Sequence, residues 1–195
     1  MRVWIAAVLS IFMATVYAQS GAERSYSLSD DNALWDEAEL VEDRYQEAPV
    51  DWYGVNDNAL KTTLYFPCKP DDAPARVEGH RSAQFSCNFG DRIYVANIQS
   101  NHLPNIDMQL KFLIGAVRDV TKSLQQAGVA PTVEPIKRVI YGDARGRQVR
   151  IISADVEMEM RLLYRPGFIL MLGVRDEPGQ LTESQDPFFN AVKLK

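Results

Sequence analysis

The sequence has few of the residues from which metal centres and nucleophilic sites are built. Its 195 residues include only two cysteines, Cys68 and Cys87, and two histidines, His80 and His102. Two cysteines are too few for a disulfide-built miniprotein. The histidines lack the His-x-x-x-His or Glu-flanked spacing of a zinc site, so we interpret both as surface residues.

Motifs of catalytic and ligand-binding loops are missing as well. Gly142 and Gly146 are not followed by the Lys-Ser/Thr pair of a phosphate loop, and they lead into an expected strand instead of a helix. There is no Gly-x-Ser-x-Gly nucleophile elbow. Asp71-Asp72 lacks the alternating acidic ligands of a calcium loop. The sequence therefore indicates neither a metal nor a cofactor.

Long apolar runs are confined to the N-terminus. Arg2 precedes the apolar residues 3–16, and Val16-Tyr17-Ala18 carries the small or branched residues that a signal peptidase inspects. The run is shorter than the roughly 20 residues that a membrane-spanning helix needs. We therefore expect residues 1–18 to be a cleaved signal peptide. The chain from Gln19 onward is expected to be exported, to a periplasm or outside the cell, and to keep no membrane span.

The composition is globular, but the charge is unevenly distributed. Hydrophobic residues make up 46% and charged residues 24% of the chain, which is typical of a folded domain. Residues 19–58 hold eleven acids and two arginines, a net charge of −9, whereas residues 59–195 hold fifteen acids and eighteen bases, a net charge of +3. The shift predicts an acidic N-terminal arm at 19–58 and a globular domain at 59–195. Such an arm repels phosphates and argues against a nucleic-acid partner.

The arm carries a faint helical pattern. Apolar and aromatic residues recur at three- and four-residue spacing after a possible N-cap at Ser29 or Asp30: Leu34, Trp35, Ala38, Val41 and Tyr45. Such a segment can dock on its own domain, remain a solvated acidic linker, or present Trp35 to a protein partner. The high charge favours the first two interpretations.

The globular region alternates β-rich runs with one long helix. Strands are expected at 61–66, in two runs within 80–100 joined at Gly90, and at 135–141, 147–154, 156–165 and 168–176. An apolar stripe predicts a helix over 105–127 that Gly128 ends, and a short helix is expected within 182–194. This order predicts an α+β fold, in which one long and one short C-terminal helix pack on one side of an antiparallel sheet.

The run over 156–165 alternates apolar and charged residues. Met158, Met160 and Leu162 share one face, and the other face holds Glu157, Glu159, Arg161 and Arg165. Two carboxylates at this spacing can act as acid and base in a cleft. The same spacing arises on any exposed strand face, where the arginines balance the acids, and we favour this second interpretation.

The two cysteines have competing interpretations. An isolated pair in an exported protein is most often a disulfide. If the strand at 61–66 formed a simple hairpin with the strand at 81–87, Cys68 and Cys87 would lie at opposite ends and be too far apart to bond. A different pairing of the first strand removes this objection. Cys68 has no neighbouring histidine and no Cys-x-x-Cys spacing, so the disulfide is favoured over a nucleophile.

The most prominent basic feature flanks the turn at 142–146. It consists of Lys137, Arg138, Arg145, Arg147 and Arg150. Several of these side chains can converge around one turn. They can receive the chain's own acidic arm, bind an anionic component of the cell envelope, or serve solubility alone.

Three short motifs resemble those of small exported bacterial domains with the PsbP-like fold. They are "FPCKP" after the first strand, "YGDARGR" between two strands and the terminal "FFNAVKLK". The resemblance covers residues 61–195 and implies an antiparallel sheet packed on helices, in a class where non-enzymatic accessory roles are usual. The photosynthetic ion-retention role is not carried over, because no matching ligand motif is present.

From these observations we predict an exported, non-catalytic accessory or binding domain. It would engage a protein or an anionic envelope component through the acidic arm, with Trp35, or through the basic turn. The alternative is a hydrolase or metal-dependent enzyme that uses Glu157, Glu159 or His80 in a cleft on the sheet.

Overall fold

The computed structural model describes residues 40–43, 45–58, 61–77, 80–100, 106–181 and 187–194. The expected signal peptide, Trp35 and His102 lie outside these residues. The helical pattern of the arm is not continued in the described part, because Leu40–Asp43 is a β-strand.

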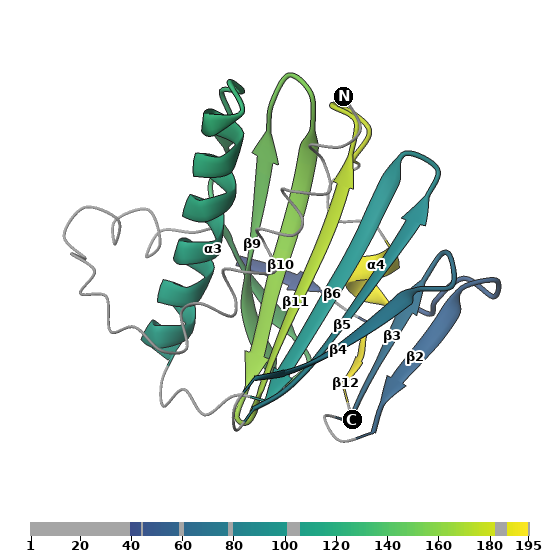
Figure 1. Ribbon diagram of the computed structural model, residues 1–195. Coiled ribbons are helices and arrows are strands. Elements are labelled where there is room, and N and C mark those ends of the chain that lie inside the picture. The colour runs from purple at the N-terminus through teal and green to yellow at the C-terminus, as the bar shows by residue number, and fades with distance from the viewer. Residues whose placement is uncertain are drawn as a thin grey trace.

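Most described strands form one large sheet (Figure 1). Its strands, in spatial order, are β1 (Leu40–Asp43), β8 (Lys137–Tyr141), β9 (Ala144–Ile152), β10 (Glu157–Arg165), β11 (Phe168–Asp176), β6 (Arg92–Ser100), β5 (His80–Phe89) and β4 (Asp71–Val77). The short β7 (Thr132–Val133) pairs with β9 beside this path. The β1–β8 pair is parallel, and the other pairs between described strands are antiparallel.

A second, smaller sheet and two helices complete the described structure. The small sheet has the order β12 (Lys193–Leu194), β3 (Thr62–Phe66) and β2 (Tyr53–Asp57). The helices are α3 (Ile106–Gln126) and α4 (Pro187–Asn190). The single turn of α4 is much shorter than the C-terminal helix that the sequence predicted, because the chain after it extends into β12.

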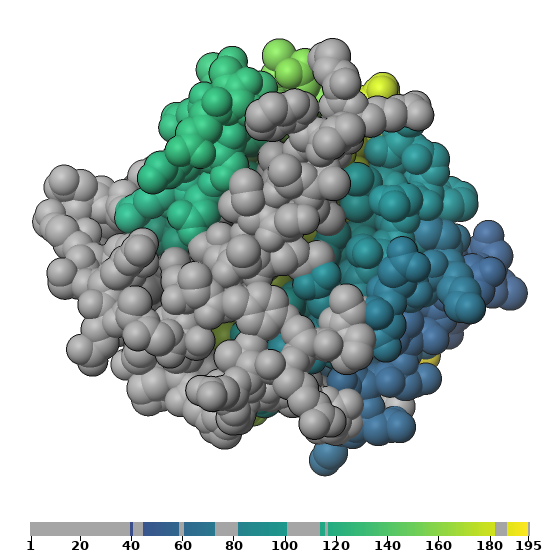
Figure 2. All heavy atoms as spheres, viewed as in Figure 1, coloured from purple at the N-terminus to yellow at the C-terminus, as the bar shows by residue number. Residues whose placement is uncertain are grey.

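The two faces of the large sheet carry separate hydrophobic cores. On one face, Val117, Val120 and Leu124 of α3 pack on strand residues such as Met160 and Leu162. On the other face, Phe188 and Phe189 of α4 pack together with the small sheet. Figure 1 shows α3 alongside β9 and β10, with α4 on the opposite side of the sheet. In the space-filling view α3 (green) lies at the upper left, and the strands around residues 80–100 (teal) lie on the right, next to the bluer residues that precede them (Figure 2).

The predicted fold class is therefore wrong. The protein is mostly antiparallel β-sheet, and its two described helices lie on opposite faces instead of together on one side. The sequence interpretation missed the strands with weak alternation. β4 contains Asp71, Asp72 and Pro74, which are uncommon in strands, but it lies at the edge of the large sheet, where proline is tolerated.

Several local predictions are confirmed. The helix predicted over 105–127 is α3, and Gly128 after it has a φ of 80°, which is the left-handed conformation of a helix end. Gly90 joins β5 to β6 with a φ of 65°. These features depend on local patterns, so the sequence alone was sufficient to place them.

The disulfide between Cys68 and Cys87 is also confirmed, with a Cα–Cα distance of 5.9 Å. The hairpin that argued against it does not form, because β3 pairs with β2 and β12 in the small sheet. It is β4 that pairs with β5, and Asp71 lies opposite Ser86. Cys68 lies between β3 and β4, close to Cys87 on β5. The disulfide therefore links the segment between β3 and β4 to the large sheet.

Candidate functional site

Three of the four charged residues of β10 are buried, contrary to the expectation of an exposed strand face, and Arg165 is half-buried. Glu157, Glu159 and Arg161 are 1%, 3% and 0% exposed. Alternation correctly placed them on one face, but α4 and the residues after β11 cover that face. Burying charges is costly unless they are paired and hydrogen-bonded, so their partners decide what they do.

Arg161 is held between neighbouring strands and the C-terminal segment. Its Nε and Nη2 donate to Gln148 Oε1 at 2.9 and 2.6 Å. Its Nη1 donates to Asn190 Oδ1 at 3.0 Å and to the Phe189 carbonyl at 3.2 Å. The guanidinium also lies 4.9 Å from the centre of the Phe189 ring. Arg161 therefore fastens α4 to the large sheet.

Two ion pairs hold the end of β11 and the residues that follow it. Glu157 pairs with Arg150 and accepts the Gly179 N–H at 2.7 Å, while Arg150 donates to the Leu181 carbonyl at 2.7 Å. Arg92 Nε donates to Asp176 Oδ2 at 2.6 Å. Both arginines and both carboxylates have protein partners, so this network explains how residues 176–181 are held against the sheet.

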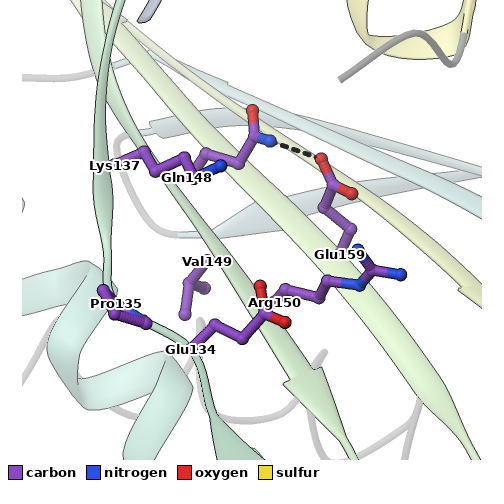
Figure 3. Close-up of a pocket in the computed structure, with 7 residues that line it drawn as sticks. All are labelled: Glu134, Pro135, Lys137, Gln148, Val149, Arg150 and Glu159. Atoms are coloured by element: carbon purple, nitrogen blue, oxygen red, sulfur yellow. Dashed lines mark hydrogen bonds between the residues drawn. The ribbon is translucent and has the colours of Figure 1, made fainter. Parts of the chain in front are cut away.

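The space beside this network is small. Glu159 accepts a hydrogen bond from Gln148 Nε2, and Figure 3 shows these two side chains pointing toward each other from neighbouring strands. The adjoining cavity has a volume of about 20 Å³, room for about one water molecule. It is lined by Glu134, Pro135, Lys137, Gln148, Val149, Arg150 and Glu159. This cavity beside Glu159 is therefore too small to hold a substrate.

The structure separates the five basic residues that flank the turn. Arg138 lies directly opposite Arg147 on neighbouring strands, and Arg145 lies opposite Tyr164. These residues are on the α3 side of the sheet, because Arg147 is level with Leu162 of the α3-side core. We call Arg138, Arg145 and Arg147 the arginine patch. Lys137 and Arg150 belong to the opposite face, where both line the small cavity.

The patch places like charges next to one another. Arg138 and Arg145 are exposed and Arg147 is half-buried. Directly opposed side chains in an antiparallel pair have Cβ atoms about 5 Å apart, and like charges there are destabilising by a few tenths of a kcal/mol or more. An anion placed between two guanidiniums removes this repulsion and receives charge-assisted, often bidentate, hydrogen bonds. The geometry therefore suits an anionic ligand.

Tyr164 adds a polar group beside the patch. Its hydroxyl oxygen is buried and has no hydrogen-bond partner among the residues that the structure describes. Burial raises the pKa of Tyr164, and the nearby charges of Arg147 and Arg145 oppose that rise. The hydroxyl is thus a neutral donor next to the arginines.

An acidic segment of the chain lies along the same edge of the sheet. β1 pairs with β8 so that Leu40 is level with Arg138 and Asp43 with Tyr141. Sequence reasoning did not find this strand, because four residues are too few to show an alternating pattern. The opposition of Arg138 and Arg147 was accessible from the sequence once the turn is limited to Gly142-Asp143, since pairing outward from that turn brings the two together.

The remaining candidates of the sequence analysis among the described residues are Asp71, Asp72 and His80. Asp71 and Asp72 are exposed at the edge of the sheet, and His80 begins β5. The described side chains form no group of three or more His, Cys, Asp or Glu residues able to hold a metal ion. Within the same part of the chain, no helix is long and apolar enough to cross a membrane.

Comparison with known proteins gives no family for this chain: no family model matches its sequence, and no curated protein is significantly similar to it. The resemblance to PsbP-like domains therefore stays a prediction. The functional assignment depends on the geometry of the site.

Proposed function

We propose that this chain is an exported, non-catalytic binding domain that recognises an anionic partner through the arginine patch. The observation that carries the proposal is the direct opposition of Arg138 and Arg147, with Arg145 next to them on the same face. Two guanidiniums that face each other on neighbouring strands, with a third on the same face, favour a ligand that supplies negative charge.

Two features support the non-catalytic role and the exported location in this proposal. Glu157 and Glu159, the carboxylates of the alternative enzyme hypothesis, are engaged by Arg150, Gln148 and the Gly179 N–H. The Cys68–Cys87 disulfide is compatible with an oxidising, exported compartment.

The contribution of the arginine patch to the affinity for an anion can be estimated. A hydrogen bond to a charged group contributes about 1.5–3 kcal/mol, and about 1.4 kcal/mol corresponds to a tenfold change in affinity. Reversing two of the three charges should therefore weaken binding of an anion at least tenfold. Exposed charges are screened by salt, so the affinity should also fall as ionic strength rises.

The test compares three proteins in their exported, oxidised form: the wild type, Arg145→Glu/Arg147→Glu, and Arg118→Glu/Lys122→Glu. Arg118 and Lys122 are exposed residues of α3, so their double reversal changes the net charge by the same amount outside the patch. Binding to a poly-glutamate peptide, to inorganic polyphosphate and to neutral poly-glutamine would be measured at several salt concentrations.

We expect salt-sensitive binding to an anionic probe, a loss of tenfold or more in the double variant, and a change of less than about threefold in the control. Equal weakening in both variants would show a general charge effect. Equal binding by the double variant and the wild type would refute the proposal.

A further inference from the structure

The edge of the large sheet beside the patch is occupied by a short strand. β1 adds to the outer side of β8 over Leu40–Asp43, and its four pairs with β8 run from Leu40–Arg138 to Asp43–Tyr141. Its sequence, LVED, includes two acids and belongs to the most acidic part of the chain. An acidic extended peptide is thus already seated at this edge.

Several features make β1 a weakly held strand. It has only four residues, and its pairing with β8 is parallel, which is slightly less stable per residue than antiparallel pairing. Leu40 is 44% exposed, so much of its apolar surface stays in contact with water. By contrast, β8 also pairs with β9 and contributes Val139 and Tyr141 to the core.

The residues after β1 have anchors of their own. The Gln46 N–H donates to the Asn190 carbonyl at 2.8 Å, and the Lys193 amino group lies 5.3 Å from the centre of the Tyr45 ring. β1 can therefore leave β8 without detaching the segment that follows it. Such a departure would expose the main-chain groups of the β8 edge next to Arg138.

We propose that the anionic partner is an acidic peptide segment that adds to the β8 edge as a strand in place of β1. Main-chain hydrogen bonds from β8 provide affinity, as in other cases of strand addition. Carboxylates along the added strand provide specificity, because they lie beside Arg138, which itself faces Arg147. This inference rests on the proposed function and adds to it the class of partner and the role of β1 as an internal competitor.

The test uses the whole exported protein and a synthetic peptide with the sequence of residues 36–47, with a charge-free Asn/Gln version as its control. Val41→Pro should weaken β1, because proline fixes φ and removes one main-chain donor from a strand of only four residues. Val50→Pro is its matched control, since Val50 is fully exposed in a turn outside the strands. Glu42→Cys/Ile140→Cys joins two residues that are level in the β1–β8 pair. Mass spectrometry would confirm the new bond and the native one.

The apparent affinity of a site falls with the fraction of molecules in which it is open. We therefore expect Val41→Pro to bind the acidic peptide at least threefold more tightly than the wild type, and Val50→Pro to match the wild type. The cross-linked variant should bind at least tenfold more weakly, and the two single-cysteine variants should behave as wild type. The charge-free peptide should not bind.

The outcomes separate the two proposals. If anionic probes bind in a patch-dependent way but neither Val41→Pro nor the cross-link changes peptide binding, strand addition is refuted and the proposed function stands. The same conclusion holds if vesicles of phosphatidylglycerol and phosphatidylcholine bind through the patch while the peptide does not. If no anionic probe depends on the patch, both proposals fail.

Discussion

Replacing Gly146 with alanine should strongly destabilise the protein. Gly146 lies on β9 between Arg145 and Arg147 and faces Leu163 of β10. An added Cβ would lie 2.0 Å from the Leu162 carbonyl oxygen and 2.9 Å from Leu163 Cδ2. The nearest atom belongs to the backbone, so no rotation of a flexible side chain can relieve the contact.

The size of the effect follows from this distance. The oxygen must retreat by about 1 Å to reach 3.0 Å, the distance below which Cβ contacts essentially never occur. Overpacking a sheet or core costs about 1–3 kcal/mol, and more where the backbone must move. Separating β9 from β10 also weakens ladder hydrogen bonds, at about 1 kcal/mol each. We expect Gly146→Ala to lower the free energy of unfolding by at least about 3 kcal/mol.

Urea denaturation of the oxidised protein, followed by circular dichroism, would measure this change. The matched control is Gly173→Ala on β11, where the nearest atom to an added Cβ is the Glu159 carbonyl oxygen at 4.0 Å. The control should change stability by less than about 1 kcal/mol. Equal effects of the two substitutions, or a loss below about 1 kcal/mol for Gly146→Ala, would refute the reasoning.

Three other substitutions have defined expectations. Arg161→Met should lower the free energy of unfolding by about 3–5 kcal/mol, because it leaves the buried acceptors around Arg161 without their donor. Urea titrations would measure this change, and a loss below about 1 kcal/mol would contradict a stabilising role for this network. Cys68→Ser/Cys87→Ser opens a loop with a sequence separation of 19 and should cost about 3 kcal/mol, measured as a lower thermal midpoint than that of the wild type. Tyr164→Phe should be neutral or slightly stabilising near pH 7, since the hydroxyl has no partner among the described residues. Burial raises the pKa of Tyr164 above its ordinary value of 10.0 in the folded state. The wild type should therefore lose stability relative to the phenylalanine variant as the pH rises above about 10. Parallel stability curves of the two proteins from about pH 8 to 11 would argue against this pH dependence.

Local patterns in the sequence placed many of the elements correctly. The stripe of α3, its end at Gly128 and the turn at Gly90 depend on interactions between residues that are close in the chain. The same holds for the alternation of β10, which correctly grouped Glu157, Glu159 and Arg161 on one face. Such patterns predict which residues share one face of a helix or strand.

The candidate site was predicted only in part. The basic residues around the β8–β9 turn predict one cluster, but Arg150 lies on the other face of β9 from Arg145 and Arg147. The period of two along a strand was sufficient to separate Arg147 from Arg150. The position of β1 beside Arg138 could not be predicted from the sequence, because a four-residue strand is too short to show which distant segment it pairs with.

The sequence by itself determined the periodicity of the strands, the extent of α3 and the preferred pairing of Cys68 with Cys87. Only the tertiary structure decided what covers each face of the large sheet. α4 and residues 176–181 lie over the charged face of β10. The charged side chains that the sequence predicted to be exposed therefore form a buried network, which holds the C-terminal segment. Alternation distinguishes two faces of a strand, but which face meets water depends on the segments that pack against it.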